Sequence, residues 1–360
     1  MILVSILGDF HSSILPISYE FKKKITKHII VYDDAKCDVK RANRIIKGQK
    51  KFIATLPLES KYEIETFQID EDNYTSIINC FYKIKQMSTD YRNLYLNATD
   101  GLSSIAIVLS NSFFSIEAKV ITYDRYANTY NLHTKENIEK HKIINNMDIS
   151  SHLILKGYVL LEKTDTKILQ KRKDVIYDLT QDLIRFKEFT TILGKQSIED
   201  IVGYKEIKAL LKKIKNPDKK FIQGTVFEEY IYHLIVDNCN FDDVWMGTKV
   251  QFEEGVENEF DILMIKDNHL HTIECKLVNN LRGEHFVYKT ELIMDYLDDD
   301  GKSMILSIGG DNINISKTGK KRVQFTLGDK ARAYYGDIKI YQSKVFNEIK
   351  FLDDVREWFL

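Results

Sequence analysis

The side chains best suited to chemistry stand close together in the second half of the chain. In the run Ile273-Glu274-Cys275-Lys276 an acid and a lysine are two residues apart, and Asp261 precedes the acid by thirteen residues. Both stretches are apolar enough to be buried strands. Because side chains alternate along a strand, Glu274 and Lys276 project to one side, and Cys275 points the other way into a core.

This arrangement suits metal-assisted cleavage of a phosphodiester. Carboxylate oxygens are the ligands that Mg²⁺ and Mn²⁺ prefer, and such an ion neutralises transition-state charge and activates a bound water. A nearby lysine can orient the water and stabilise charge on the phosphate. We expect Asp261, Glu274 and Lys276 to be catalytic. The expected cofactor is Mn²⁺ or Mg²⁺, with Asp261, Glu274 and Cys275 among the metal-binding residues.

A third acid lies upstream, on an expected helix that begins near Gly224. Its apolar stripe consists of Phe227, Ile231, Leu234 and Ile235. Glu228, at the start of this helix, could reach the same cation directly or through water, so we include it among the catalytic and metal-binding residues. Glu229 is the competing candidate if the helix phase differs by one residue.

Length and composition favour a two-domain protein. At 360 residues the chain is longer than one core usually organises, and a hydrophobic fraction of 44% is sufficient for two cores. A formal net charge of -1 gives no global sign of nucleic-acid binding, so any such surface must be local. One basic run extends from Lys208 to Lys220, and a solvated helix face explains it as well as a nucleic-acid contact does. The other, Lys317 to Arg322, lies in an expected loop and is better suited to contact phosphate.

Other metal and membrane signals are missing from the sequence. The four cysteines, Cys37, Cys80, Cys239 and Cys275, show no paired metal-ligand spacing, and the histidines include no pair at helical ligand spacing. The chain carries no basic leader and no apolar run of membrane-spanning length. We therefore expect no zinc site and no membrane association, and a cytoplasmic location.

The first half alternates expected strands with expected helices. The expected strands are 2–7, 28–32, 63–69, 93–97 and 119–123, and the clearest helices are 74–87 and 103–115. Such alternation predicts a parallel, doubly wound α/β sheet. Sheets of this kind bind ligands at the carboxyl ends of their strands.

Two loops at such strand ends are the candidate ligand-binding segments. The first follows strand one and comprises Leu7, Gly8, Asp9, Phe10, His11 and Ser12, and the second comprises Asn97, Thr99, Asp100, Gly101, Ser103 and Ser104. The second loop enters a helix whose first turn offers free N–H groups to an anion. Neither loop has the spaced glycines of a dinucleotide fingerprint or a P-loop. Simple helix capping would explain the second loop equally well on local grounds.

The second half resembles the PD-(D/E)xK restriction-endonuclease-like core. The resemblance rests on a helix with Glu228, a strand with Asp261, a strand with Glu274 and Lys276, and a helix near 287–297. It covers roughly 224–341. An acid and a lysine two apart are common on half-exposed strands, but here they lie on otherwise buried strands, where unpaired acids are costly.

The first half resembles the CRISPR-associated Rossmann fold (CARF) sensor domains, through Asn97-Ala98-Thr99-Asp100-Gly101 at the fourth strand end. Together the halves resemble the cyclic-oligoadenylate-activated nucleases of type III CRISPR defence. That resemblance implies a homodimer that binds cyclic tetra-adenylate and switches on a metal-dependent nuclease for DNA, RNA or both. Asp100 replaces a family glycine; its carboxylate would repel a phosphate ring, so it caps the helix or bonds a ribose hydroxyl.

The expected fold is therefore α/β, with a Rossmann-like CARF domain at 1–147, a structured connector at 148–220 and a restriction-endonuclease-like α/β/α core at 221–360. In the connector we expect a strand at 157–161 and helices at 174–189 and 198–214. Two alternatives stay open. One is a CARF regulator without a working nuclease, and the other is a sensor that degrades its own cyclic nucleotide, assisted by His11 or a serine of the first loop.

Overall fold

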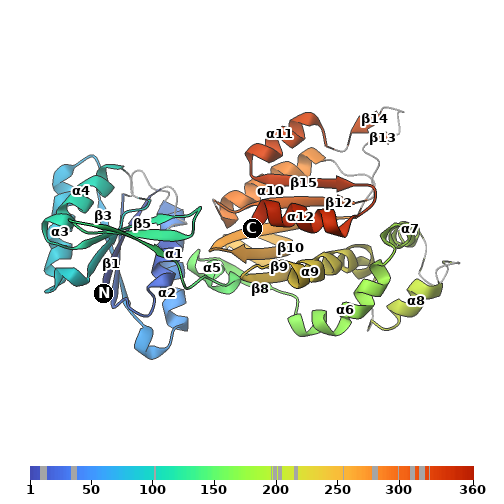
Figure 1. Cartoon of the computed structure of the whole chain (residues 1–360), viewed down its shortest axis with the longest axis horizontal. Coiled ribbons are helices and arrows are strands. Elements are labelled where there is room, and N and C mark those ends of the chain that lie inside the picture. The colour runs from blue at the N-terminus through green and yellow to red at the C-terminus, as the bar shows by residue number, and fades with distance from the viewer. Residues whose placement is uncertain are drawn as a thin grey trace. The chain divides into compact units, whose positions relative to one another are not determined.

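The computed structural model describes residues 1–8, 14–33, 39–100, 103–195, 197, 201, 205–214, 218–253, 255–277, 283–298, 300–308, 313–315, 321–323 and 325–360. The chain divides into two compact units, Met1–Val159 and Leu160–Leu360. Figure 1 shows that each unit has its own sheet with helices packed against it. None of the helices within the described residues has the length and apolarity needed to cross a membrane.

The first unit is built on a seven-stranded sheet of order β3-β2-β1-β4-β5-β6-β7. Its elements are β1 (Ile2–Leu7), α1 (Ile14–Glu20), β2 (Lys27–Asp33), α2 (Val39–Thr55), β3 (Glu63–Ile69), α3 (Tyr74–Gln86), β4 (Leu94–Asn97), α4 (Ser103–Ser115), β5 (Lys119–Asp124), β6 (Thr129–His133), β7 (Ile138–Lys142) and α5 (Ile149–Leu155). Strands β1 to β5 are parallel, as the sequence predicts. The antiparallel strands β6 and β7, which the sequence analysis did not predict, extend one edge.

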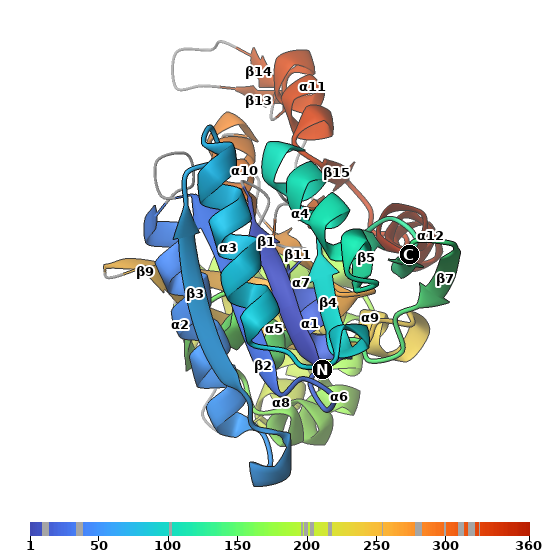
Figure 2. The same ribbon diagram turned by 90° about the vertical axis from the view of Figure 1, so that its left-hand side faces the viewer.

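Helices cover both faces of this sheet. Val4 and Ile6 of β1 pack with buried residues of α3 and α4 on one face. Leu3 packs with α1 and α2 on the other face. Figure 2 shows α3 and α4 side by side across the sheet. The near-continuous apolar composition of these strands therefore reflects burial on both faces, as in other parallel sheets.

The second unit contains a six-stranded sheet of order β15-β12-β11-β10-β9-β8. Its elements are β8 (Val159–Glu162), α6 (Thr166–Thr180), α7 (Leu183–Leu193), α8 (Lys205–Leu211), a π-helical turn η5 (Phe221–Thr225), α9 (Val226–Asn238), β9 (Asp243–Glu253), β10 (Val256–Lys266), β11 (His269–Lys276), α10 (Gly283–Leu297), β12 (Ser303–Ile308), β13 (Ile313–Ile315), β14 (Lys321–Val323), α11 (Leu327–Tyr335), β15 (Ile338–Ser343) and α12 (Glu348–Phe359). Strand β8 begins at the boundary between the units.

Two apolar clusters hold the layers of the second unit together. Ile262, Ile273 and Met304 pack with α9, α12 and the helices α6 to α8. Val287 of α10 and Ala333 of α11 pack with strand residues on the opposite face. Figure 1 shows α9 and α10 on opposite sides of the sheet. The central strands are thus enclosed between these two layers.

The segment between the expected domains differs in detail from the sequence prediction. The chain up to Val159 belongs to the first unit and the rest to the second. The single helix expected at 174–189 is wrong, because α6 ends at Thr180 and α7 begins at Leu183. The Asp182 side chain accepts a hydrogen bond from Arg185 N and caps α7, which separates the two helices. Within the expected helix at 198–214, the described helical residues are those of α8.

Candidate active site

A tight hairpin places the predicted site residues on adjacent strands. Strands β10 and β11 pair antiparallel, with Ile262 opposite Ile273. The two residues between the strands, Asp267 and Asn268, have positive φ values of 49° and 73°, as a type I′ turn requires. This register continues to place Asp261 opposite Glu274. Because Ile262 and Ile273 face the apolar core, the side chains of Asp261 and Glu274 face the other way.

Lys276 joins the two acids. Its Nζ lies 2.6 Å from Glu274 Oε1 and 3.3 Å from Asp261 Oδ2. Cys275 N donates a hydrogen bond of 2.7 Å to the same oxygen of Asp261. The Asp261 side chain is 13% exposed, so solvent retains access to an otherwise enclosed group. The ring of Phe286 on α10, which the sequence analysis did not single out, lies 5.7 Å from Lys276 Nζ.

Glu228 comes to the same place from α9. Burial raises the pKa of its carboxyl to about 8, and repulsion by Asp261 and Glu274 adds to the shift. Gly224, in the π-helical turn before α9, leaves room for it: a Cβ there would lie 3.4 Å from Glu228 Oε1. Glu229 is fully buried and points to α6, where Arg172 Nε lies 2.5 Å from its Oε2. The helix phase therefore directs Glu228, and not Glu229, to the acidic group.

The charges of this group suit a divalent cation. Burial and repulsion by Glu274 raise the pKa of Asp261 to about 6, although Lys276 and Cys275 N oppose the shift. Burial disfavours the charge on Lys276, but Asp261 and Glu274 outweigh burial and raise its pKa. Three carboxyl groups thus share one ammonium, and a bound cation would relieve the remaining repulsion. Oxygen donors of this kind fit Mg²⁺ or Mn²⁺.

The main chain of Cys275 faces the acidic group, whereas its side chain does not. Its side chain is 4% exposed and packs in the apolar core with Ile273. Burial raises the pKa of the thiol well above its ordinary value. Within a strand, the N–H and C=O of one residue point to the same side, and Cys275 N points to Asp261. The carbonyl oxygen, rather than the thiol, is therefore the atom of this residue suited to an ion.

In the first unit, the two candidate ligand-binding loops meet at neighbouring strand ends. Strand β1 lies beside β4, with Ser5 opposite Asn97. The segments that follow these strands approach so closely that a Cβ on Gly8 would lie 1.7 Å from the carbonyl oxygen of Asp100. The chain leaves β1 and β4 towards opposite edges of the sheet, so this is the topological switch point where such folds bind ligands.

Asn97 and Thr99 shape the second loop. Asn97 is 1% exposed, and its Oδ1 accepts a hydrogen bond of 2.6 Å from Thr99 Oγ1. Thr99 Oγ1 in turn accepts one of 2.8 Å from Tyr123 N on β5. Leu7 is fully buried, and Ser104 is exposed in the first turn of α4. Asp9, Phe10, His11, Ser12, Gly101 and the side chain of Ser103 lie outside the described residues.

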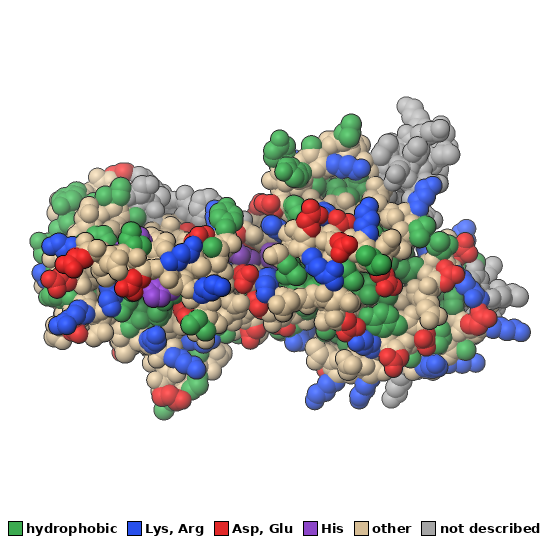
Figure 3. Space-filling model, in the orientation of Figure 1, with side chains coloured by type: hydrophobic (Ala, Val, Ile, Leu, Met, Phe, Trp, Pro, Cys, Tyr) green, Lys and Arg blue, Asp and Glu red, His purple; other side chains and the backbone are tan. Residues whose placement is uncertain are grey.

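The predicted basic runs are described only in part. Lys212, Lys213, Lys219 and Lys220 are exposed, whereas Lys317 and Lys320 lie outside the described residues. On the face drawn in Figure 3, basic and acidic side chains are interspersed, in keeping with the net charge of -1. The exposed lysines of the first run therefore remain compatible with a solvated surface.

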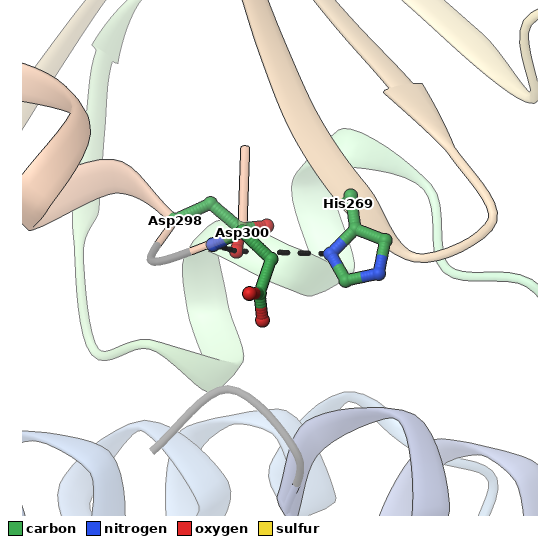
Figure 4. A group of neighbouring side chains, drawn as sticks. All are labelled: His269, Asp298 and Asp300. Atoms are coloured by element: carbon green, nitrogen blue, oxygen red, sulfur yellow. Dashed lines mark hydrogen bonds and ion pairs between the residues drawn. The ribbon is translucent and has the colours of Figure 1, made fainter. Parts of the chain in front are cut away.

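A second acidic group, which sequence reasoning missed, lies at the other end of β11. His269, Asp298 and Asp300 offer potential ligand atoms within 4.8 Å of one another (Figure 4). His269 and Lys276 begin and end β11, about 23 Å apart at the usual strand rise. Asp298 accepts hydrogen bonds from Leu270 N and Asp300 N, which gives it a structural role in the turn before β12. Asp298 and Asp300 stand two apart in one acidic run, but His269 lies 29 residues earlier, so no local pattern links it to them.

A family model matches part of the second unit. Residues 215–339 match the family model for the Card1-like endonuclease domain. This segment contains Glu228, Asp261, Glu274 and Lys276. A search among curated proteins finds no match.

Solved structures resemble the whole chain. Can2 from Sulfobacillus thermosulfidooxidans, in complex with cyclic tetra-adenylate, matches with a TM-score of 0.70 at 17% identity, over 99% of this chain and 98% of that chain. VC1899 from Vibrio cholerae matches with a TM-score of 0.72 at 16% identity, over 99% and 97%. A type III CRISPR defence DNA nuclease activated by cyclic oligoadenylate matches with a TM-score of 0.50 at 12% identity, over 86% and 46%. The chain thus shares the fold of Can2 and VC1899 along its length, and its second unit includes a segment that resembles the Card1-like endonuclease domain.

Proposed function

We propose that this chain is a metal-dependent nuclease of type III CRISPR defence, activated by cyclic oligoadenylate. The observation that carries the proposal is the group Asp261, Glu274 and Lys276, with its contacts of 2.6 and 3.3 Å, inside the segment that matches an endonuclease domain. The fold shared with Can2, which was solved with cyclic tetra-adenylate, supports that ring as the activator.

Each residue of the second unit has a distinct task in this proposal. Asp261, Glu274, the Cys275 carbonyl and Glu228 would hold Mn²⁺ or Mg²⁺. The bound ion supplies charge neutralisation and an activated water. Lys276 keeps its positive charge because Asp261 and Glu274 raise its pKa, so it can orient water and stabilise negative charge on the phosphate. Glu228, whose pKa is raised to about 8, would have to lose its proton to serve as a ligand of the cation.

The first unit would bind the activator at the switch point. Main-chain groups near Gly8 and the first turn of α4 can donate hydrogen bonds to phosphate oxygens. Asn97 and Thr99 hold the loop in place through their contacts with each other and with Tyr123 N. We propose that two copies of the chain bind one cyclic tetra-adenylate, and that DNA, RNA or both are substrates.

A panel of labelled substrates tests the proposal. Single-stranded DNA, duplex DNA and RNA are incubated with the purified protein, with Mn²⁺ or EDTA, and with or without cyclic tetra-adenylate. We expect cleavage of at least one substrate that needs both the metal and the activator and disappears in Asp261→Asn. Cleavage that persists in EDTA, or at the same rate in Asp261→Asn, would contradict the assignment of the site.

A further inference from the structure

Arg172 of α6 makes two contacts near the beginning of α9. Its Nε lies 2.6 Å from Oε1 and 2.5 Å from Oε2 of Glu229, whose side chain is fully buried. Its guanidinium also lies over the ring of Phe221, 4.7 Å from the centroid. One side chain therefore contacts both the π-helical turn η5 and the first turn of α9, the two segments next to Glu228.

The start of α9 is bonded through the main chain to the turn before it, where Val226 N donates to Phe221 O, but it lacks a side-chain cap. Thr225 stands at the N-cap position but makes no side-chain capping hydrogen bond. The five residues before α9, Phe221–Thr225, form a π-helical turn, a rare conformation that changes the phase of a helix and occurs often at functional sites. Gln223 Nε2 donates a hydrogen bond of 3.2 Å to Thr190 O and ties this turn to α7. The contact with Arg172 adds a buried, charged anchor to the first turn of α9 itself.

The orientation of Glu228 depends on the rotation of α9 about its axis. Glu228 and Glu229 are neighbours, so their side chains point about 100° apart around the helix. At a side-chain radius of about 5–6 Å, a helix rotation of about 20° displaces the Glu228 carboxylate by about 2 Å. Productive site geometries tolerate only about 0.5 Å. The ion pair of Glu229 therefore acts together with the core packing of Phe227 and Ile231 to set where the Glu228 carboxylate lies.

We infer that Arg172, through its ion pair with Glu229, is a positioning residue that holds Glu228 in reach of the cation at Asp261 and Glu274. The inference rests on the proposed function and names a residue that shapes its metal site. Helix α6, which carries Arg172, is the first helix after the boundary between the units.

Binding of Mn²⁺, measured by isothermal titration calorimetry on the full chain, tests this inference independently of cleavage. The Asp261→Asn variant defines which part of the heat comes from the site. The informative variant is the double substitution Arg172→Met and Glu229→Met. Replacing both partners of a buried ion pair by apolar side chains usually preserves stability, whereas removing one partner leaves an uncompensated charge. We expect its unfolding temperature to stay close to that of the parent while its Kd for Mn²⁺ rises at least tenfold.

The matched control is Lys173→Met with Asp237→Met. This pair, 2.6 Å apart, also joins α6 to α9, but Asp237 lies about 13 Å farther along the helix than Glu228. We expect its Kd for Mn²⁺ to stay within twofold of the parent value. An equal rise in the control would overturn the specific role of Arg172, as would parent-like Mn²⁺ affinity in the Arg172 and Glu229 double variant.

The same titration separates the inference from the proposed function. A parent chain that binds no Mn²⁺ at the site contradicts the proposed function, and the inference falls with it. A parent chain that binds Mn²⁺ while the double Met variant binds it equally well contradicts the inference alone. Arg172→Lys keeps the charge but removes the planar guanidinium, so we expect it to give an intermediate Kd.

Discussion

At the scale of single residues, the proposal assigns different tasks to an acid and to the lysine beside it. Asp261→Asn removes a charge that the cation needs, and Lys276→Ala removes the ammonium that lies 3.3 Å away. We predict that Asp261→Asn abolishes both metal binding and cleavage. Lys276→Ala should still bind the metal but lose about 10²–10³ in rate, the usual effect of losing one group that stabilises developing charge.

Calorimetric metal titration and cleavage assays on the two variants check this division. Both substitutions lie in the second unit, so we expect both variants to bind cyclic tetra-adenylate as the parent does. Cleavage by Asp261→Asn near the parental rate would show that the metal is held elsewhere.

The raised pKa of Glu228 predicts a pH dependence of stability. Burial, together with repulsion by Asp261, raises this pKa from 4.5 to about 8, so folding favours the protonated carboxyl. Its contribution to the free energy of unfolding is full below pH 4.5 and is lost as the pH rises through 8. In EDTA, the unfolding temperature should therefore fall between pH 5.5 and pH 7.5, and Glu228→Gln should reduce that fall.

Addition of Mn²⁺ should counter this loss. The cation binds the deprotonated carboxylates, so it should raise the unfolding temperature more at pH 7.5 than at pH 5.5. At a concentration one hundred times its Kd, a ligand adds about 2.7 kcal/mol to the free energy of unfolding. Thermal scans at the two pH values measure both effects, and a larger shift at pH 5.5 would refute the carboxylate assignment.

At the scale of elements, the contact between the two loops of the first unit is the most sensitive feature. Because a Cβ on Gly8 would lie 1.7 Å from Asp100 O, Gly8→Ala must push the loops after β1 and β4 apart. We predict that this variant loses at least tenfold in affinity for cyclic tetra-adenylate, measured by calorimetry. Gly328→Ala is the control, since a Cβ there would meet nothing closer than 3.6 Å. Parental affinity in Gly8→Ala would place the ligand away from this contact.

The elements also show how far sequence patterns reach. Apolar runs and helical periodicity predicted β1 to β5, α3 and α4 within one or two residues. Most of these elements bury a regular apolar face, although β3 is largely exposed. The antiparallel β6 and β7 were missed because their half-exposed residues, such as His133 and Ile138, lack an apolar run. The break between α6 and α7 depends on one capping residue, Asp182, inside an otherwise continuous helical pattern.

The site was accessible from sequence to a similar degree. The spacing of Glu274 and Lys276 on a strand predicted their shared face, whereas the choice between Glu228 and Glu229 needed the structure. The ion pair of Arg172 with Glu229 joins residues 57 positions apart in the chain, so no local pattern signals it. The hydrogen bond from Cys275 N to Asp261 likewise depends on strand register, which the residue type does not reveal.

At the scale of the whole molecule, the proposal requires that a ligand of the first unit controls chemistry in the second. Such control is possible only if cyclic tetra-adenylate binds the active conformation more tightly than the resting one. The chain provides covalent continuity from β8 to α6, and Arg172 connects α6 to α9.

The most direct test is the cleavage rate measured against the concentration of cyclic tetra-adenylate, at saturating Mn²⁺, for the parent and for Asn97→Ala with Thr99→Ala. We predict saturable activation of the parent. The double variant removes the hydrogen bonds that shape the second loop, so its half-activating concentration should rise by the equivalent of about 1–3 kcal/mol. An unshifted curve in the double variant would place the activator elsewhere, and full cleavage without any activator would contradict the central claim.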